Sequence, residues 1–449
     1  MVKLLPPLFL LLLTGCTSSG VVKNVAKLDV PGSEQPYAFA SVTSRSSGGG
    51  VGLILAFSGG GTRAAALAYG VMQELRDSVV FVDGRERRLL DEIDIISSVS
   101  GGSFTSAYYG LYGEGLFEDF EDVFLKRDVQ HQLTMTVLNP LHWFGSTGRT
   151  ERAVGIYQKE IFHDKTFADM QARGGPAIII NASDLEYGVR FSFVQDYFDL
   201  LCSDINSFPV ARAVTASSAV PILFNPVAVE NFPGCEREQA RFHRLVDKHE
   251  DDLDPVLREV VRGVKTYESK DRRQYVHFVD GGITDNLGLR AVYEMIEVTG
   301  GARSFMQRYN RKPPSRLIVI SVDASTDPVL EMGQSLKKPS LEESIGAMSS
   351  VQLHLYNAAT LDLMGRALKR WSQELSTPQQ TVDPYFINIG FNDIQQQEAL
   401  DYFNSVPTSF VLTDEQVDRL IVAGRELLRN NAEFQRLMDG LQRDSVAVP

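Results

Sequence analysis

The chain has 449 residues, of which 43% are hydrophobic and 22% are charged, as in an ordinary globular enzyme or binding protein. The net charge of −13 argues against a nucleic-acid partner, which requires a basic face, and against broad electrostatic adsorption to anionic lipid. The length is sufficient for an extensive core.

The N-terminal stretch MVKLLPPLFLLLLTGC indicates an export signal, because a basic residue precedes an apolar run that is too short to span a bilayer. Its end resembles a bacterial lipobox, in which Cys16 is acylated; an ordinary signal peptide with an incidental Cys16 is the alternative. We therefore expect a signal peptide over 1–15 and a lipid-anchored envelope protein. By the same resemblance Thr17 favours the outer membrane, facing the periplasm or the cell surface. Residues 16–50, rich in Ser and Gly, are predicted to be a flexible tether.

From residue 51 onward, short apolar runs alternate with helical stretches. Such alternation predicts an α/β fold with a largely parallel sheet covered by helices, and ligands then bind outside the carboxyl ends of the strands. The candidate strands are 51–57, 92–100, 176–183, 275–280, 316–323 and 384–391, and the candidate helices include 62–77 and 103–116.

Later segments are expected to be additions to this core. A charged helical insert is predicted over 252–273, and two amphipathic helices over 340–371 and 414–431, within an extension (326–449) packed on the core. Thr413 and Gln416 form a plausible capping box. Cys202 and Cys235 either form a disulfide in an oxidising compartment or remain buried thiols.

Three glycine-containing motifs lie at strand ends. In LAFSGGGTRAAAL, the N–H groups of Gly59, Gly60 and Gly61 precede a helix and can bind an anion or an oxyanion, although a plain tight turn is the alternative. The spacing matches no nucleotide-binding loop. Arg63 either steadies a lipid phosphate or forms a structural ion pair, and we favour the latter.

The second motif, IISSVSGGSFTSAYYG, is typical of a strand–turn–helix elbow that carries a nucleophilic serine. We expect the strand to end at Ser100, the turn to lie at Gly101-Gly102 and the helix to start at Phe104. Ser103 then occupies the corner and is the predicted nucleophile. Ser100 is the competitor, but this interpretation leaves it within the strand end.

The third motif, HFVDGGITDNLGL, puts Asp280 at a strand end on the same edge of the sheet. Asp285 is expected to be a turn or cap residue. A catalytic triad requires a histidine, and the one that follows, His354, lies in a helical pattern where packing is its expected role. A dyad in which Asp280 acts directly on serine remains. The acidic run 250–254 lacks a calcium-loop pattern, so neither metal nor cofactor is expected.

Together with ARAVTASSAVPILFNPV (211–227), these motifs resemble the signature blocks of patatin-like phospholipases in the right order. The resemblance covers 51–325 and implies a three-layer α/β/α fold. It also implies a Ser103–Asp280 dyad, a glycine-loop oxyanion hole and hydrolysis of acyl esters of lipids, as in phospholipase A or lysophospholipase reactions.

One departure from the family pattern is Thr105, where the elbow usually ends in glycine. A lipid acyltransferase is an alternative, and so is a catalytically silent envelope lipoprotein that binds lipid or a partner. The stretches 133–145 and 302–314 are candidates for lipid access, although core packing is the favoured role of the first.

Overall fold

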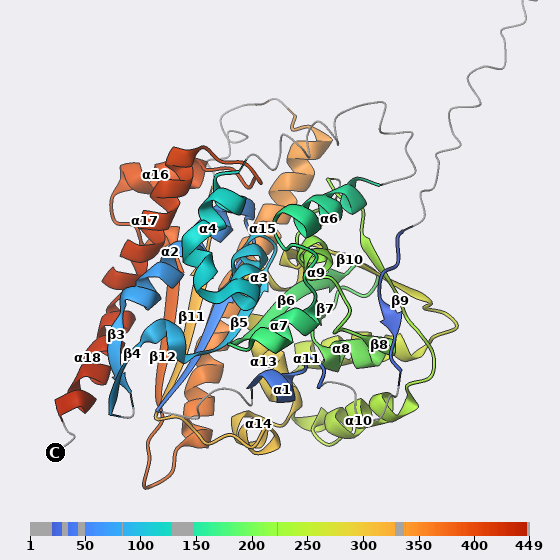
Figure 1. Ribbon diagram of the computed structural model, residues 1–449, viewed down its shortest axis with the longest axis horizontal. Coiled ribbons are helices and arrows are strands. Elements are labelled where there is room, and N and C mark those ends of the chain that lie inside the picture. Colours follow the sequence, from blue (N-terminus) through green and yellow to red (C-terminus); the bar gives the residue numbers. More distant parts are fainter. Residues whose placement is uncertain are drawn as a thin grey trace, which may run out of the picture.

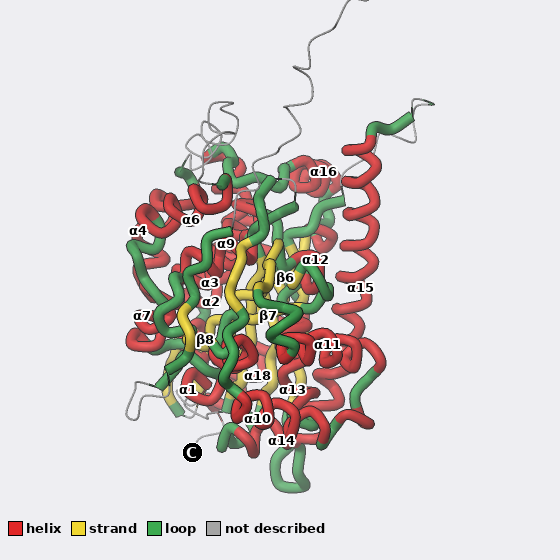
Figure 2. Tube along the Cα trace, turned by 90° about the vertical axis from the view of Figure 1, so that its right-hand side faces the viewer, coloured by secondary structure: helices red, strands yellow, loops and turns green. Residues whose placement is uncertain are grey.

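The structure, a computed structural model, is built on one central sheet between two layers of helices (Figures 1 and 2). It describes residues 20–28, 35–43, 50–82, 84–127, 148–221, 223–327, 336 and 338–446. In sheet order the strands are β12 (Asp383–Gly390), β11 (Arg316–Asp323), β2 (Val51–Phe57), β5 (Ile93–Val99), β6 (Ala177–Asp184), β10 (Tyr275–Val279) and β9 (Val227–Glu230), with β7 (Arg190–Ser192) paired to β6. Every predicted strand is present.

The five strands from β12 to β6 are parallel, whereas β10, β9 and β7 pair antiparallel with their neighbours. All residues of β2, β5 and β6 are buried, because helices cover both faces of the sheet. This explains why these strands appear in the sequence as continuous apolar runs. The predicted mostly parallel α/β architecture is confirmed.

The helices divide between the two faces, with α3 and α7 on one side of the strands and α11 and α15 on the other (Figure 2). Their bounds are α1 (Phe39–Thr43), α2 (Gly61–Asp77), α3 (Gly101–Tyr112), α4 (Leu116–Phe120), α6 (Arg149–Glu160), α7 (Phe167–Arg173), α8 (Gln195–Phe198), α9 (Val210–Ser217), α10 (Glu236–Asp247), α11 (Pro255–Lys265), α12 (Gly282–Asp285), α13 (Leu289–Val298), α14 (Ala302–Arg308), α15 (Leu341–Leu375), α16 (Gln397–Ser405), α17 (Asp414–Asn430) and α18 (Ala432–Val446). Two short hairpin strands, β3 (Val79–Val82) and β4 (Arg85–Arg88), follow α2. Among the described helices, none has the length and apolar character needed to cross a bilayer.

The C-terminal extension completes the sheet and covers α2. Strand β12 is its edge strand, and α17 packs along α2 so closely that a Cβ on Gly70 would lie 2.1 Å from the carbonyl oxygen of Ile421. On the other helix, a Cβ on Gly424 would lie 2.4 Å from the carbonyl oxygen of Leu67. Both positions therefore require glycine. The capping box of Thr413 and Gln416 at the start of α17 is confirmed.

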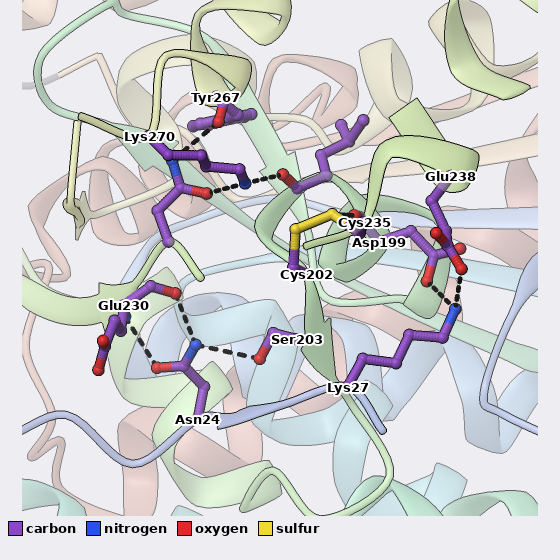
Figure 3. Close-up of a disulfide and its surroundings, with 12 residues drawn as sticks. Asn24, Lys27, Asp199, Cys202, Ser203, Glu230, Cys235, Glu238, Tyr267 and Lys270 are labelled. Carbon is purple, nitrogen blue, oxygen red and sulfur yellow. Dashed lines mark hydrogen bonds and ion pairs between the residues drawn. A yellow bond between two sulfur atoms is a disulfide. The ribbon is translucent and has the colours of Figure 1, made fainter. Parts of the chain in front are cut away.

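The predicted tether is wrong for the parts of it that the structure describes. The strand β1 (Val25–Ala26) pairs with β8 (Ser203–Asp204), and the Asn24 amide donates to the Ser203 hydroxyl and to the Glu230 carbonyl (Figure 3). The Tyr37 hydroxyl, buried against β6, donates to the Ile178 carbonyl over 3.0 Å. These contacts are long-range, so a polar composition alone could not indicate them. The predicted signal peptide (1–15), Cys16 and the stretch 133–145 lie outside the described residues.

Cys202 and Cys235 form a disulfide, with Cα atoms 5.3 Å apart (Figure 3). This decides between the two alternatives that the sequence left open. The bond closes a loop with a sequence separation of 33 residues, next to the contacts of the N-terminal segment with β8.

We expect the Cys235→Ser variant to lose about 2–4 kcal/mol of unfolding free energy, because the disulfide restricts the unfolded chain. Chemical denaturation with and without reductant measures the loss. The reduced parent protein should match the oxidised variant; an unchanged midpoint on reduction contradicts the prediction.

Candidate active site

Ser100 occupies the sharp corner between strand and helix. Strand β5 ends at Val99, helix α3 begins at Gly101, and Ser100 between them has φ 49° and ψ −121°. A positive φ is unfavourable for a residue with a Cβ and is found where surrounding structure enforces it, as in nucleophile elbows. The Ser217 hydroxyl at the end of α9 accepts the Ser100 N–H over 2.8 Å and helps to hold this conformation.

Two glycines after Ser100 allow the elbow to pack against the glycine loop. A Cβ on Gly101 would lie 2.0 Å from the carbonyl oxygen of Gly61, and a Cβ on Gly102 would lie 2.7 Å from the Cβ of Phe57. Gly102 thus fills the position two residues after the corner where an elbow requires glycine. The signature is Ser98-x-Ser100-x-Gly102, with a small serine in place of the first glycine.

The Ser100 hydroxyl donates a hydrogen bond to Asp280 Oδ2 over 2.8 Å. The other carboxylate oxygen of Asp280 accepts the Gly282 N–H over 2.8 Å, and the backbone N–H of Asp280 donates to the Ala219 carbonyl. Asp280 is only 9% exposed, and this burial raises its pKa to about 6. The structure therefore brings Asp280, at the end of β10, directly to a serine.

The predicted position of Ser103 was wrong. Ser103 lies in the first turn of α3, fully buried, and its hydroxyl contacts the Ser217 hydroxyl at 3.1 Å. Ser217 directs its own hydrogen to the Asn181 carbonyl at 2.6 Å, so Ser103 is the donor of the pair. The error has a physical cause: Gly101-Gly102 was interpreted as a turn, but the pair begins the helix and serves its close packing.

The glycine loop turns at the start of α2 beside this elbow. Gly60 and Gly61 have φ of 140° and 61°, and within the described chain their N–H groups have no protein acceptor. The Gly59 N–H, in contrast, donates to the Asn286 carbonyl over 3.0 Å, which contradicts its predicted role as an oxyanion donor. Gly101 directly follows the corner serine, the position whose N–H group contributes to the oxyanion hole of a nucleophile elbow.

Thr105 and the glycine loop's arginine are packing residues. The Thr105 hydroxyl donates to the Ala65 carbonyl of α2 over 2.9 Å, so the threonine joins α3 to α2 and leaves the elbow's glycine at its proper place. Arg63 is buried, and its guanidinium donates to the Ala324 and Val406 carbonyls at 2.9 and 2.6 Å. Burial lowers its pKa to about 10. This environment supports a structural role, but within the described residues the hydrogen-bond partners of Arg63 are two carbonyls and the Thr408 hydroxyl and not the carboxylate of the expected ion pair.

We expect Arg63→Ala to destabilise the protein by about 2–4 kcal/mol, since buried carbonyls lose a charged donor. The activity of the variant should decrease by the same factor on a phospholipid and on a neutral monoacylglycerol. The reason is that the guanidinium donates its hydrogen bonds to the protein and does not bind the lipid phosphate. Parallel assays of the two substrates measure the ratio. A loss confined to the phospholipid would instead assign Arg63 to the phosphate.

The remaining predicted residues lie apart from the Ser100–Asp280 pair. Asp285 accepts the Ala291 N–H over 3.0 Å at the start of α13, as a cap residue does, and burial raises its pKa to about 6. His354 contacts the Thr326 carbonyl at 3.1 Å from α15. In the acidic run 250–254, Asp254 caps α11. Within the described ranges, no cluster of His, Cys, Asp or Glu is arranged to hold a metal ion.

The Phe410 ring packs with aromatic side chains from three other segments, and two of these, Phe104 and Tyr157, are buried in the core. The Phe410 ring lies 6.0 Å from that of Phe104, 6.4 Å from that of Tyr157 and 6.2 Å from that of Phe224.

The stretch 302–314 lies at the opposite end of β5 from Ser100, where Arg311 pairs with Asp94 at 2.9 Å. Predicted lipid access through 302–314 therefore does not agree with the position of Ser100.

Comparisons with known proteins identify a family and several solved structures to which the chain is similar. The family model for patatin-like phospholipases matches residues 55–293. Among solved structures, human GIVD cytosolic phospholipase A2 has 12% identity and a TM-score of 0.43, with 88% of this chain and 62% of that one covered. Its complex with methyl gamma-linolenyl fluorophosphonate has 11% identity and a TM-score of 0.41, with 95% of this chain and 70% of that one covered. VipD from Legionella pneumophila has 13% identity and a TM-score of 0.31, with 87% of this chain and 67% of that one covered.

A search of curated protein sequences finds no match. The chain spans under two thirds of the length of the human GIVD phospholipase chain, so that protein's further segments have no counterpart in this comparison. The family match covers more than half of this chain and includes the glycine loop, the elbow and Asp280. The chain belongs to the patatin-like phospholipase family.

Proposed function

We propose that this protein is a lipid acyl hydrolase in which Ser100 is the nucleophile and Asp280 the general base. The observation that carries this assignment is the 2.8 Å hydrogen bond from the hydroxyl of a serine with positive φ to a buried carboxylate. Ser100 thus replaces Ser103 as the proposed nucleophile. The N–H groups of Gly60, Gly61 and Gly101 are the proposed oxyanion hole.

The reaction follows from this arrangement. Asp280 takes the hydroxyl proton as Ser100 Oγ attacks the ester carbonyl, and the glycine N–H groups stabilise the oxyanion that forms. The C–O bond to the leaving alcohol breaks, and Asp280 protonates that alcohol. Asp280 then deprotonates a water molecule that attacks the acyl-enzyme, and Ser100 recovers its proton as the fatty acid leaves. A pKa of about 6 makes Asp280 a stronger base than an exposed aspartate.

A lipid substrate is supported by family membership. We also propose that acylation of Cys16 anchors the protein in the envelope, at the outer membrane, where its lipid substrate is present.

The test is to incubate the purified protein with a panel of phospholipids, lysophospholipids and acylglycerols, with and without an added alcohol. The hydrolase is supported if free fatty acid is released and if its rate of release falls in proportion to the fraction of protein labelled by the fluorophosphonate. Transfer of the acyl chain to the alcohol in preference to water would make the protein an acyltransferase. Absence of both labelling and turnover would leave a lipid-binding lipoprotein and refute the proposal.

A further inference from the structure

The N-terminal half of α15 is an exposed, uncharged helix surface. No Asp, Glu, Lys or Arg occurs between Glu343 and Asp362, although 22% of the chain is charged. Met348, Val351 and Leu355 are 62%, 51% and 65% exposed. We call these three side chains the α15 stripe.

The stripe lies opposite the face by which α15 packs on the domain. Asn357, Thr360 and Met364 are buried and mark the packed face. At about 100° per residue, Met348 lies half a revolution from Asn357, and Val351 and Leu355 lie on the same outer side as Met348. The outer face therefore has apolar side chains where a solvent-exposed helix normally has charged ones.

The stripe extends from the same end of the sheet as the proposed active site. Ser325, just after β11, accepts hydrogen bonds from Asn286 at 3.3 Å and from Asn357 at 3.0 Å, so it links the loop after Asp280 to α15. The turns that precede Asn357 continue beyond the strand end, and Figure 2 shows α15 rising along the edge of the molecule. Met348 lies about 13 Å further along the helix axis than Asn357.

Two further exposed apolar side chains lie next to the proposed catalytic residues. Ile283 is 54% exposed and follows Asp280 by three positions. Leu223 is 56% exposed and lies in the segment after Ala219, whose carbonyl accepts the Asp280 N–H. Together with the α15 stripe, these side chains concentrate apolar surface at the end of the molecule that carries Ser100.

We propose that the α15 stripe docks on the hydrocarbon surface of a lipid bilayer and presents the Ser100 end of the domain to membrane lipid. The proposal rests on the proposed lipid substrate. The net charge of the chain also favours a lipid bilayer that is contacted through apolar side chains. With a net charge of −13, adsorption to anionic headgroups is repulsive, so contact of the domain itself with the bilayer, beyond the proposed Cys16 anchor, favours an uncharged apolar face. The stripe is such a face, adjacent to the site that acts on lipid.

The docking is tested with full-length protein that carries Ser100→Ala, which prevents turnover, and Cys16→Ser, which removes the acylation site and its thiol. A fluorophore that responds to polarity is attached at Leu355→Cys. The matched control is Val422→Cys on α17, where valine is 51% exposed. Each protein is mixed with phosphatidylethanolamine–phosphatidylglycerol vesicles that carry nitroxide-labelled acyl chains. We expect a blue shift and quenching at position 355 and neither at position 422.

A second arm uses active protein that keeps Ser100 but carries Cys16→Ser, so that no acyl chain holds it on the vesicle, and changes all three stripe residues to glutamine. We expect the rate on vesicles to fall at least about tenfold, the factor that about 1.4 kcal/mol of lost apolar burial produces. Hydrolysis of a dispersed short-chain ester should stay unchanged. Val256→Gln with Val422→Gln is the control and should retain both rates.

Equal signals at 355 and 422, or an unchanged vesicle rate, overturn the proposal. Light scattering without vesicles also tests the proposal. If the parent protein is a dimer and the triple glutamine variant is a monomer, the stripe is an interface between two copies and the proposal is overturned. Failure of the proposed function gives a different result: the dispersed ester is not hydrolysed, whereas the fluorescence arm needs no turnover and still reports docking.

Discussion

Ser100→Ala is expected to lower kcat/KM for a phospholipid or a dispersed ester by at least about 10⁴-fold, because no other hydroxyl contacts Asp280 in the described structure. Fluorophosphonate labelling should disappear with it. Ser103→Ala should keep activity within about tenfold of the parent, since Ser103 only donates to Ser217. Its cost should be about 1 kcal/mol of unfolding free energy. Steady-state kinetics and labelling of the two variants decide between the serines.

Ser100→Gly provides a further control for this pair. Glycine adopts a positive φ without strain, so this variant should be inactive and yet at least as stable as Ser100→Ala. Thermal unfolding compares the two. Labelling that survives in Ser100→Ala and is lost in Ser103→Ala would refute the assignment of the nucleophile.

Asp280→Asn should reduce kcat/KM by about 10³-fold or more, because the amide cannot take the Ser100 proton. The fold should persist, since an asparagine can still accept the Gly282 N–H and lie beside Ser100.

In the parent protein, kcat/KM should rise with pH through about 6 and then level off, since only ionised Asp280 acts as the base. A pH profile of the parent protein measures this limb.

Stability should show the opposite pH dependence. Burial raises the pKa of Asp280 from 3.8 in the unfolded chain to about 6 in the folded protein, so the folded state favours the protonated carboxyl. Its contribution is fully present below about pH 4 and is lost as the pH rises through 6. At pH 8 the ionised carboxylate costs roughly 3 kcal/mol, so Asp280→Asn should be at least as stable as the parent.

Asp285→Asn is the matched control for both measurements. Asp285 is also buried and burial raises its pKa to about 6, but it caps α13 and does not contact Ser100. This variant should retain the activity and the ascending limb near pH 6. If the limb disappears in Asp285→Asn and remains in Asp280→Asn, the general base has been misassigned.

The architecture and the components of the site are encoded in local sequence patterns. Long apolar runs such as 51–57 and 316–323 are buried on both faces, and their composition shows this without any contact information. The glycine loop and the serine-rich elbow each follow a parallel strand, so their meeting at the carboxyl edge of the sheet was predictable. Asp280 follows the antiparallel strand β10, so its place at this edge depends on the register that sets Val279 opposite Ser183 near the end of β6. The capping box of α17 is a local signal and was predictable for the same reason.

Which serine contacts Asp280 depends on long-range packing in the folded chain. Gly101-Gly102 matches a turn in local terms, but a Cβ at either position would collide with the glycine loop or with β2, so the pair belongs to the helix. The corner therefore falls at Ser100. The same holds for Gly59, whose N–H is taken by a residue more than 200 positions away, and for the N-terminal segment that pairs with β8. Local patterns encode elements, whereas hydrogen-bond partners and close approaches depend on segments that only the folded chain brings together.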